Sequence, residues 1–274
     1  MTQHKTLTHP GSLSGIGIHS GNKVCLEFSP SKEEGITFKQ KQNPQKKLTV
    51  SPKTSHSEHN RATCLKNSSM TISTPEHLLS ACAGLGLTHL SITIDQEEIP
   101  ILDGSAKPFI DLFTSLGITA LPSTVAPIII KEPIHLYEHD QAIIVTPSSA
   151  PIFSYFLHYP HPVINTQCIS LEFTQSSYIS SISEARTFGF EEEIQHLIKN
   201  GLAKGGSLDN ALVIGDTDYI NPPRFPDECA RHKLLDLIGD CWILNRPIHG
   251  HITGIKSGHS LNNALVKHLT KILA

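Results

Sequence analysis

The chain has 274 residues, which is long enough for one large domain or two of ordinary size. Hydrophobic residues make up 38% and charged residues 17%, and the formal net charge is −3; this composition indicates a globular protein with a core and no basic surface for nucleic acid. The sequence shows neither a membrane-length apolar run nor a basic-then-apolar leader. We therefore expect no transmembrane segment, no signal peptide and a cytoplasmic location.

The first half of the chain predicts short strands followed by two helices. Residues 48–73 carry β-like runs that polar turns separate. In residues 73–94, Thr74 is placed to cap a helix, Pro75 fits its first turn, "GLGL" ends it, and the alternating "THLSITI" predicts a strand. Residues 101–118 predict a turn and a second helix, whose apolar face would carry Phe109, Leu112, Phe113 and Leu116.

The second half repeats this rhythm. Strand-like runs fill residues 128–173, an amphipathic helix occupies 190–201, and a further strand occupies 210–216. Helices are predicted at about 226–244 and at 258–273. Each half therefore contains several strands and two longer helices, which predicts a duplicated α+β fold.

The stretch "TALPSTVAP", residues 119–127, contains proline and serine and predicts no regular structure. We take it as a boundary between an N-terminal domain, residues 1–122, and a C-terminal domain, residues 127–274. The six cysteines form no CxxC pair, so we expect reduced thiols, mostly in the core, and no zinc site built from cysteine.

One polar stripe runs along the helix that contains "RHKLLDLIGD". His232, Asp236 and Asp240 are four residues apart and share one side of that helix, with Lys233 beside them. An imidazole and a carboxylate one turn apart can both bind a zinc ion. The alternative is an ordinary solvent-facing side of a helix.

Two further groups could complete such a site. Glu76 and His77 stand in the first turn of a predicted helix and would provide a general base and a third ligand, although a glutamate there is also favoured by the helix dipole. In "KSGHSLNN", Gly258 permits a turn that places His259 at a helix start, where it could act as a general acid oriented by Asp240. The alternative there is a simple capping turn.

Two weaker motifs supply candidate contacts. In "SEARTFGF", Thr187 could offer a hydroxyl to an oxyanion and Phe188 a ring to a ligand. "GIGIHSG", residues 15–21, contains half of a dinucleotide-binding motif, but the third glycine and the following helix are missing. It therefore indicates only a glycine turn that places His19.

Taken together, seven blocks of sequence resemble one family. In chain order they are "GIGIHSG", "TPEHLLSACAGLG", "EIPILDGSAKPFI", "SEARTFGF", "GGS", "RHKLLDLIGD" and "KSGHSLNNALV". They resemble the UDP-3-O-acyl-N-acetylglucosamine deacetylases, zinc amidases that catalyse the committed step of lipid A biosynthesis in Gram-negative bacteria. The expected substrate is a UDP-linked acylated amino sugar, and the expected products are acetate and a UDP-3-O-acyl-glucosamine.

The resemblance implies a role for each candidate residue. The implied metal ligands, for Zn²⁺ or in the cell Fe²⁺, are His77, His232 and Asp236. The implied catalytic residues are Glu76 as general base, His259 with Asp240 behind it, and Thr187 as donor to the oxyanion; either Glu76 or His259 protonates the leaving amine. The implied substrate-binding residues are Lys233, Phe188, Cys64, His19, Lys256, Gly258, Ile194 and Ile198.

The resemblance also implies the fold. It predicts two similar domains, each a sheet packed on two helices, which together form a β-α-α-β sandwich. A βαβ insert is expected near residues 190–214, with Ile194, Leu197, Ile198 and Val213 as candidates for the wall of an acyl passage.

The chain departs from the family pattern at two positions. Thr146 stands where a lysine that helps to bind the diphosphate is usual, and Glu193 stands nearest to where an aspartate is common. Lys256 or Lys233 could compensate for the missing charge. Two alternatives remain: a related metal amidase for another acylated amino sugar, and a binding module without catalysis, whose mark would be a lost ligand or base.

Overall fold

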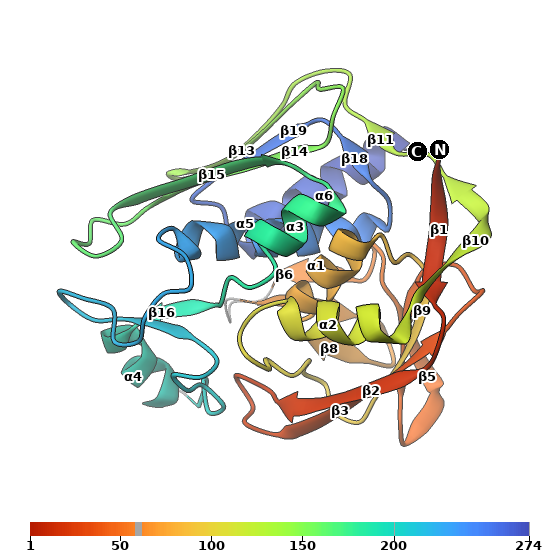
Figure 1. Ribbon diagram of the computed structural model, residues 1–274, viewed down its shortest axis with the longest axis horizontal. Helices are drawn as coiled ribbons and strands as arrows, with labels where there is room; N and C mark the ends of the chain where they lie inside the picture. Colours follow the sequence, from red (N-terminus) through yellow and green to blue (C-terminus); the bar gives the residue numbers. More distant parts are fainter. Residues whose placement is uncertain (58–61, 200, 274) are drawn as a thin grey trace.

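The computed structural model describes residues 1–57, 62–199 and 201–273, and Figure 1 shows their arrangement. The elements of the first half, in chain order, are β1 (Thr2–Leu7), β2 (Gly11–Ile16), β3 (Lys23–Pro30), β4 (Ile36–Gln40), β5 (Asn43–Thr49), β6 (Ser55–Ser57), β7 (Thr63–Lys66), β8 (Thr71–Ser73), α1 (Glu76–Leu85), β9 (Leu90–Ile94) and α2 (Lys107–Leu116).

The elements of the second half follow the same alternation of strands and helices. They are β10 (Ile118–Val125), β11 (Ile128–Ile129), β12 (Ile134–Glu138), β13 (Gln141–Thr146), β14 (Ile152–His158), β15 (Thr166–Glu172), α3 (Gln175–Ser181), β16 (Phe188–Phe190), α4 (Glu191–Lys199), β17 (Leu212–Ile214), α5 (Glu228–Cys241), the 3₁₀ turn Trp242–Leu244, β18 (Ile248–His249), β19 (His251–Ile255) and α6 (His259–Leu273).

Two five-stranded sheets have the same topology. Their strand orders are β2-β3-β9-β4-β5 and β12-β13-β19-β14-β15. In each sheet the strand that comes last in sequence lies in the centre, antiparallel to one neighbour and parallel to the other. A helix precedes this central strand (α1 or α5) and a second helix follows it (α2 or α6). The duplicated α+β fold predicted from the sequence is therefore confirmed.

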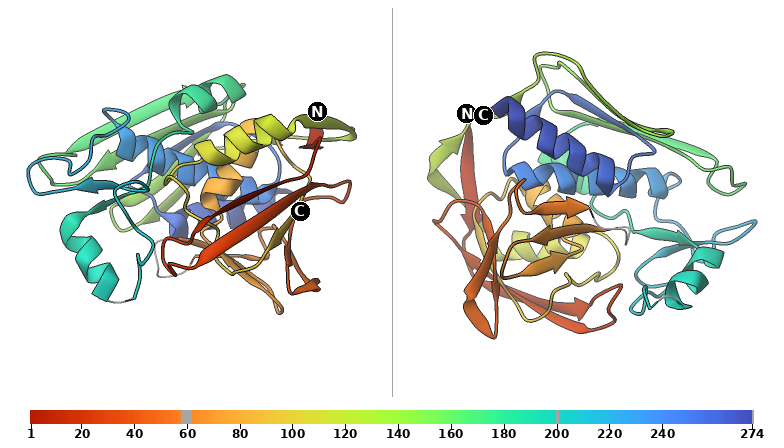
Figure 2. Two further views of the ribbon diagram at one scale, coloured as in Figure 1. Left: turned by 60° about the horizontal axis from the view of Figure 1, so that its bottom comes forward. Right: turned by 180° about the vertical axis from the view of Figure 1, so that it is seen from behind.

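Helices α1, α2, α5 and α6 lie between the two sheets, as Figures 1 and 2 show. Helices α1 and α5 cross at the centre of this layer, where a Cβ atom on Gly239 would lie 2.1 Å from the carbonyl oxygen of Glu76. Only glycine permits so close a contact between the two helices. The Trp242 indole also joins the halves, because its N–H donates to the Leu87 carbonyl at 3.1 Å.

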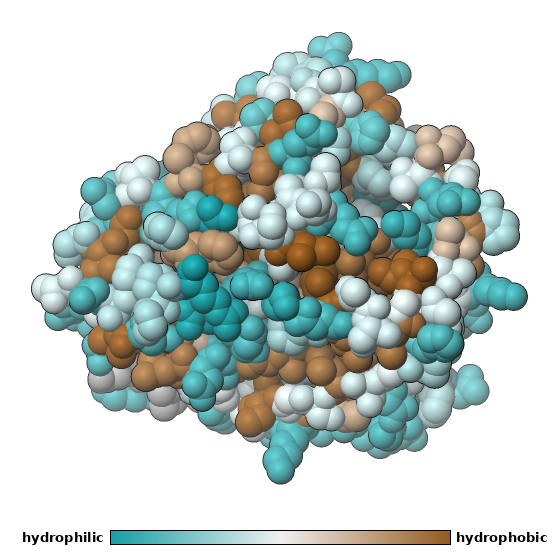
Figure 3. Space-filling view, viewed as in Figure 1, coloured by the Kyte–Doolittle hydropathy of each residue, from teal (hydrophilic) through white to brown (hydrophobic). Residues whose placement is uncertain are grey.

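The surface is mostly polar over the face seen in Figure 3, with apolar side chains exposed between the polar ones. Within the described part of the chain, no helix is both long and apolar enough to cross a membrane.

The start of α1 differs from the prediction. Thr74 does not cap the helix: its φ is 58°, Pro75 takes the N-cap position, and no described residue forms a hydrogen bond with the buried Thr74 hydroxyl. The end of the helix agrees with the prediction, because Gly86 adopts a left-handed conformation with φ of 70°.

The prediction of an irregular segment at 119–127 is wrong. Most of it forms β10, which pairs antiparallel with β1. Pro122, which cannot donate to a ladder, lies where the register shifts between Gln3 and Lys5, so the irregularity accommodates it.

Helix α3 was not predicted from the sequence. It is short and begins with a capping box, in which Thr174 and Ser177 exchange side-chain to backbone hydrogen bonds. After it, β16 precedes α4 in the sequence and β17 follows α4. The two strands pair in parallel and form a βαβ unit with this helix, which projects at one edge of the molecule in Figure 1.

Candidate metal centre and active site

Three candidate metal ligands converge where α1 meets α5. One donor atom from each of His77, His232 and Asp236 lies within 4.8 Å of the other two, and all three residues are buried. Oδ1 of Asp236 lies 3.7 Å from Nε2 of His77 and 3.4 Å from Nε2 of His232. The four-residue spacing on α5 therefore brings its two donors together, and the crossing with α1 supplies the third.

Both imidazoles are held neutral, with Nε2 directed toward the centre. His232 donates its Nδ1–H to the Ala185 carbonyl at 3.1 Å, and because that oxygen can only accept, the lone pair is at Nε2. Burial lowers the pKa of His232, and burial together with His232 lowers the pKa of His77 to about 3. Neutral imidazole is the form that binds a metal ion.

The two carboxylate oxygens of Asp236 have different surroundings. Its Oδ2 accepts from Nζ of Lys233 at 2.8 Å, whereas its buried Oδ1 has no hydrogen-bond partner among the described residues. Burial opposes the charge, but the basic groups around the carboxylate, among them the Lys233 ammonium, outweigh burial and hold the pKa of Asp236 below its usual range. An unpaired buried carboxylate oxygen beside the Nε2 atoms of two imidazoles fits a divalent cation.

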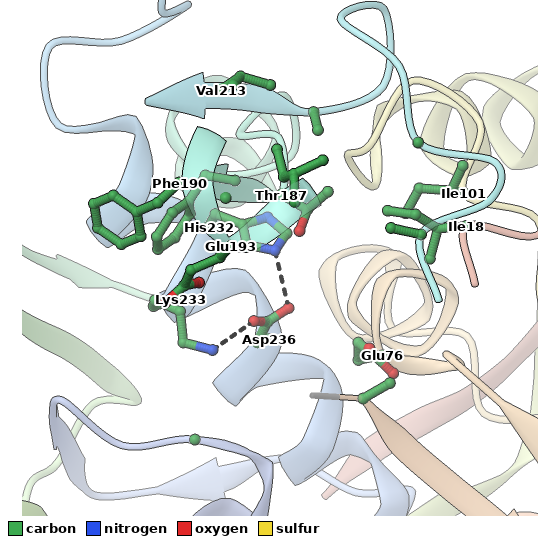
Figure 4. Close-up of a pocket in the computed structure, with 18 of the residues that line it drawn as sticks. Ile18, Glu76, Ile101, Thr187, Phe190, Glu193, Val213, His232, Lys233 and Asp236 are labelled. Carbon is green, nitrogen blue, oxygen red and sulfur yellow. Dashed lines mark hydrogen bonds and ion pairs between the residues drawn. The ribbon is translucent and has the colours of Figure 1, made fainter. Parts of the chain in front are cut away.

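Glu76 and His259 lie beside these donors. Oε1 of Glu76 is 3.9 Å from Nε2 of His259, and its Oε2 is buried without a hydrogen-bond partner in the described chain. Burial raises the pKa of Glu76 to about 8, although the neighbouring His259 opposes the shift. Figure 4 shows Glu76 reaching in from α1, opposite His232, Lys233 and Asp236 on α5.

The His259 ring is fixed from behind by Asp240. Its Nδ1–H donates to Oδ2 of Asp240 at 2.8 Å, and Asp240 also accepts from the hydroxyl of Thr63 at 2.6 Å and from the Asn262 amide at 2.8 Å. Burial disfavours the imidazolium, but Asp240 and Glu76 outweigh burial and raise the pKa of His259 to about 9. Neither Thr63 nor Asn262 was predicted from the sequence as part of the site.

A cavity of about 880 Å³ opens above these groups. The candidates that line it are Glu76, His77, Thr187, Phe188, Ile194, His19, Lys233, Lys256, Gly258, His232, Asp236 and His259. In Figure 4, Phe190 and Val213 border one side and Ile18 and Ile101 the other, so apolar side chains stand beside the polar floor. The lining residues that the sequence did not suggest include Ile18, Tyr155, His158 and Tyr159.

Four candidates need separate comment. Cys64 is buried on β7 and does not line the cavity, and the Ile198 side chain lies outside the described residues. The residue with a left-handed backbone before α6 is Lys256, with φ of 52°, and Gly258 has no positive φ. The amino group of Lys256 donates to the carboxylate of the exposed Asp140.

The two departures from the family pattern lie in different places. Glu193 lines the cavity, whereas Thr146 lies at the end of β13, paired with His251, and does not line it. His19 has its Nδ1 buried without a hydrogen-bond partner in the described chain, and burial lowers the pKa of this ring. Its backbone N–H is fixed by Glu98 at 2.8 Å.

Two imidazoles and a carboxylate around one point, with a second carboxylate beside them at the floor of a cavity, are typical of metal-dependent hydrolases. A family model described as UDP-3-O-acyl N-acetylglycosamine deacetylase matches residues 4–271. The chain belongs to this family, which confirms the resemblance found in its motifs.

Individual relatives agree over almost the whole chain. A UDP-3-O-acyl-N-acetylglucosamine deacetylase of Citrifermentans bemidjiense is 36% identical over 281 residues, covering 99% of this chain and 90% of the relative. Proteins of the same name are 38% identical in Coxiella burnetii (98% of this chain, 90% of the relative) and 37% identical in Myxococcus xanthus (96% and 85%).

Proposed function

We propose that the chain is a cytoplasmic zinc-dependent deacetylase of UDP-3-O-((R)-3-hydroxyacyl)-N-acetylglucosamine. It releases acetate and UDP-3-O-acyl-glucosamine, the committed step of lipid A biosynthesis. The observation that carries this proposal is the convergence of His77, His232 and Asp236 beside Glu76, in a chain of this family.

His77, His232 and Asp236 would hold the metal ion. Two imidazole nitrogens and a carboxylate oxygen are a frequent catalytic zinc set, and Fe²⁺ accepts the same donors. When bound, such an ion lowers the pKa of a water molecule and polarises the acetamide carbonyl. Lys233 keeps Asp236 ionised, and the Ala185 carbonyl keeps Nε2 of His232 free for binding.

Glu76 is the proposed general base. Its Oε2 has no hydrogen-bond partner among the described residues, so it can accept a proton from the attacking water. The raised pKa of about 8 makes it a stronger base than an ordinary carboxylate and suits proton transfer near neutral pH.

His259 and Thr187 are the proposed partners of the oxyanion. The raised pKa of about 9 keeps His259 cationic at neutral pH, and Asp240 orients its ring. Thr187 lines the same cavity and offers a hydroxyl. Either Glu76, once protonated, or His259 then gives a proton to the leaving amine.

The cavity would hold the rest of the substrate. Apolar surface for the acyl chain comes from Ile194, Phe190 and Val213. We propose the same role for Ile198, which lies on α4 with Ile194. The sugar nucleotide would contact Lys233, Phe188, His19, Lys256 and Gly258. Lys256 would supply the positive charge that is missing at Thr146. Cys64 remains a candidate for substrate binding only because it follows Thr63, whose hydroxyl donates to Asp240. The domain division at 122–127 also remains part of the proposal.

The decisive experiment is acetate release by the purified protein from UDP-3-O-(3-hydroxyacyl)-N-acetylglucosamine. We expect a chelator to abolish activity and zinc to restore it. His232→Ala and Asp236→Ala should each abolish tight metal binding, measured as metal per protein. Normal metal content in these variants would refute the ligand assignment, and a metal-loaded but inactive native protein would favour another acylated amino sugar as the substrate.

A further inference from the structure

We propose that Glu228 is a positioning residue for the metal centre and acts through the peptide unit between Ala185 and Arg186. This inference rests on the proposed function, because it assumes that His232 binds a metal ion. Glu228 begins helix α5, lies four residues before His232 and is fully buried. The reaction described above assigns no role to it.

One peptide unit joins the two side chains. Its N–H, that of Arg186, donates to Oε1 of Glu228 at 2.9 Å. Its carbonyl oxygen, that of Ala185, accepts from Nδ1 of His232 at 3.1 Å. The carboxylate and the imidazole both stand on α5, and the peptide from the preceding segment bridges them across one helical turn.

The carboxylate is held firmly enough to fix this peptide. Besides the Arg186 N–H, Glu228 accepts from Nε of Arg186 at 2.9 Å, from its Nη2 at 3.2 Å and from the backbone N–H of Arg224. The paired guanidinium of Arg186 lies 2.9 Å from Oε1 of Glu228 and balances the buried negative charge.

A polarised peptide would change what His232 can do. An anion that accepts the N–H shifts electron density in the peptide toward its carbonyl oxygen, which becomes a stronger acceptor. A stronger acceptor at Nδ1–H fixes the tautomer and makes Nε2 a better electron donor to a metal ion. Thr187, the next residue, is held by a different partner, because its N–H donates to the Gly104 carbonyl at 2.8 Å.

A purely structural ion pair is the competing explanation. In that case Glu228 and Arg186 would anchor the segment to α5, and any loss would appear in the stability of the fold alone. The two explanations differ in the metal affinity and in the state of the His232 ring.

The first experiment compares Glu228→Gln with Asp227→Asn. The control removes the same charge from the adjacent residue, whose carboxylate pairs with Arg231 and does not contact the bridging peptide. We expect the zinc dissociation constant, measured by chelator competition, to rise about tenfold in Glu228→Gln and to stay within about twofold in Asp227→Asn. Equal constants in the two variants would overturn the proposal.

Arg186→Lys separates the ion pair from the peptide. It keeps the backbone N–H and a cation beside Glu228, so zinc affinity should remain within about twofold of the native value. A loss as large as that of Glu228→Gln would assign the effect to the guanidinium pair and overturn the proposal.

A measurement on the native protein avoids the risk that Glu228→Gln does not fold. Zinc titrated into the labelled protein should move the Nδ1 proton of His232 and the amide proton of Arg186 downfield together. A His232 signal that moves while the Arg186 amide stays still would show that the peptide does not couple them. A native protein that binds no zinc would instead refute the proposed function.

Discussion

Glu76 and His259 face each other across 3.9 Å, and each acts on the charge of the other. The cationic ring partly offsets the rise that burial causes in the pKa of Glu76, and the carboxylate helps to keep the ring charged. The proton affinities of these two proposed catalytic groups are therefore set by burial, by one another and, for His259, by Asp240.

Glu76→Gln tests the proposed general base. The amide keeps the shape of the side chain but cannot accept a proton, so turnover should fall by about 10²–10⁴-fold, as for loss of a general base. Zinc content should stay equal to that of the native protein, because Glu76 is not among the proposed ligands. Steady-state acetate release and metal analysis check both parts, and near-native turnover would exclude the role.

The second residue-scale prediction concerns Asp240→Asn. The Asp240 carboxylate raises the pKa of His259 to about 9 against the effect of burial, so removing its charge should lower that pKa. If the cationic ring is the active form, activity is lost as pH rises through this pKa. The basic limb of the pH–rate profile should therefore move to lower pH.

The control for this change is Asp111→Asn. Asp111 is exposed on α2 and pairs with Lys107, far in sequence from His259, so the basic limb should not move. A basic limb that also stays in place in Asp240→Asn would show that it reports another group.

The sequence predicted the donors that share one side of a helix, and its motifs marked Glu76, His77 and His259, but it did not mark Thr63, which only the tertiary fold brings to Asp240. His232, Asp236 and Asp240 recur every fourth residue on α5, so their shared side follows from helix geometry alone. Thr63 meets Asp240 across 177 residues of chain, and no local pattern marks it. The structure was likewise needed to find the peptide that links His232 to Glu228.

At the scale of elements, the site depends on how closely α1 approaches α5. His77 comes from α1, whereas His232 and Asp236 come from α5, so the separation of these helices sets the separation of the donors. Gly239 permits the contact, because a Cβ there would lie 2.1 Å from the Glu76 carbonyl oxygen.

Gly239→Ala should therefore force the helices apart. We expect the free energy of unfolding to fall by about 1–3 kcal/mol, as for overpacking of a core, and zinc affinity to fall with it. Urea unfolding and chelator competition measure the two effects. For unfolding alone, Gly258→Ala is a suitable control, since among the described residues a Cβ there meets no atom within 4 Å apart from its chain neighbours. Equal stability of the two variants would mean that α1 and α5 adjust freely.

Elements with a regular pattern were predicted well, and elements defined by partners were not. The alternation in residues 90–94 and the apolar faces of α2 and α5 are properties of the local sequence. Strand β10 forms only because β1 supplies its partner, and the bulge beside Pro122 is invisible without that partner. Threonine is a residue type that commonly caps helices, but Thr74 adopts a left-handed backbone conformation instead.

At the scale of the whole molecule, the duplication explains where the site lies. Each half packs its helices against its own sheet, and the two helix layers then face one another (Figures 1 and 2). The sequence indicated the repeated rhythm of strands and helices, but the central position of β9 and β19 depends on pairing between distant strands. The proposed metal ligands come from both halves and therefore lie where the two halves meet.

This arrangement predicts that metal binding stabilises the whole fold. Only the folded chain brings His77 together with His232 and Asp236, so zinc binds the native state in preference to the unfolded chain. Free zinc at about 1,000 times its dissociation constant should add about 4 kcal/mol to the free energy of unfolding. Unfolding in urea, with buffered zinc or with a chelator, measures the difference. His77→Ala should lose this dependence on zinc while α1 still forms; a variant that kept it would show that the stabilising ion binds elsewhere.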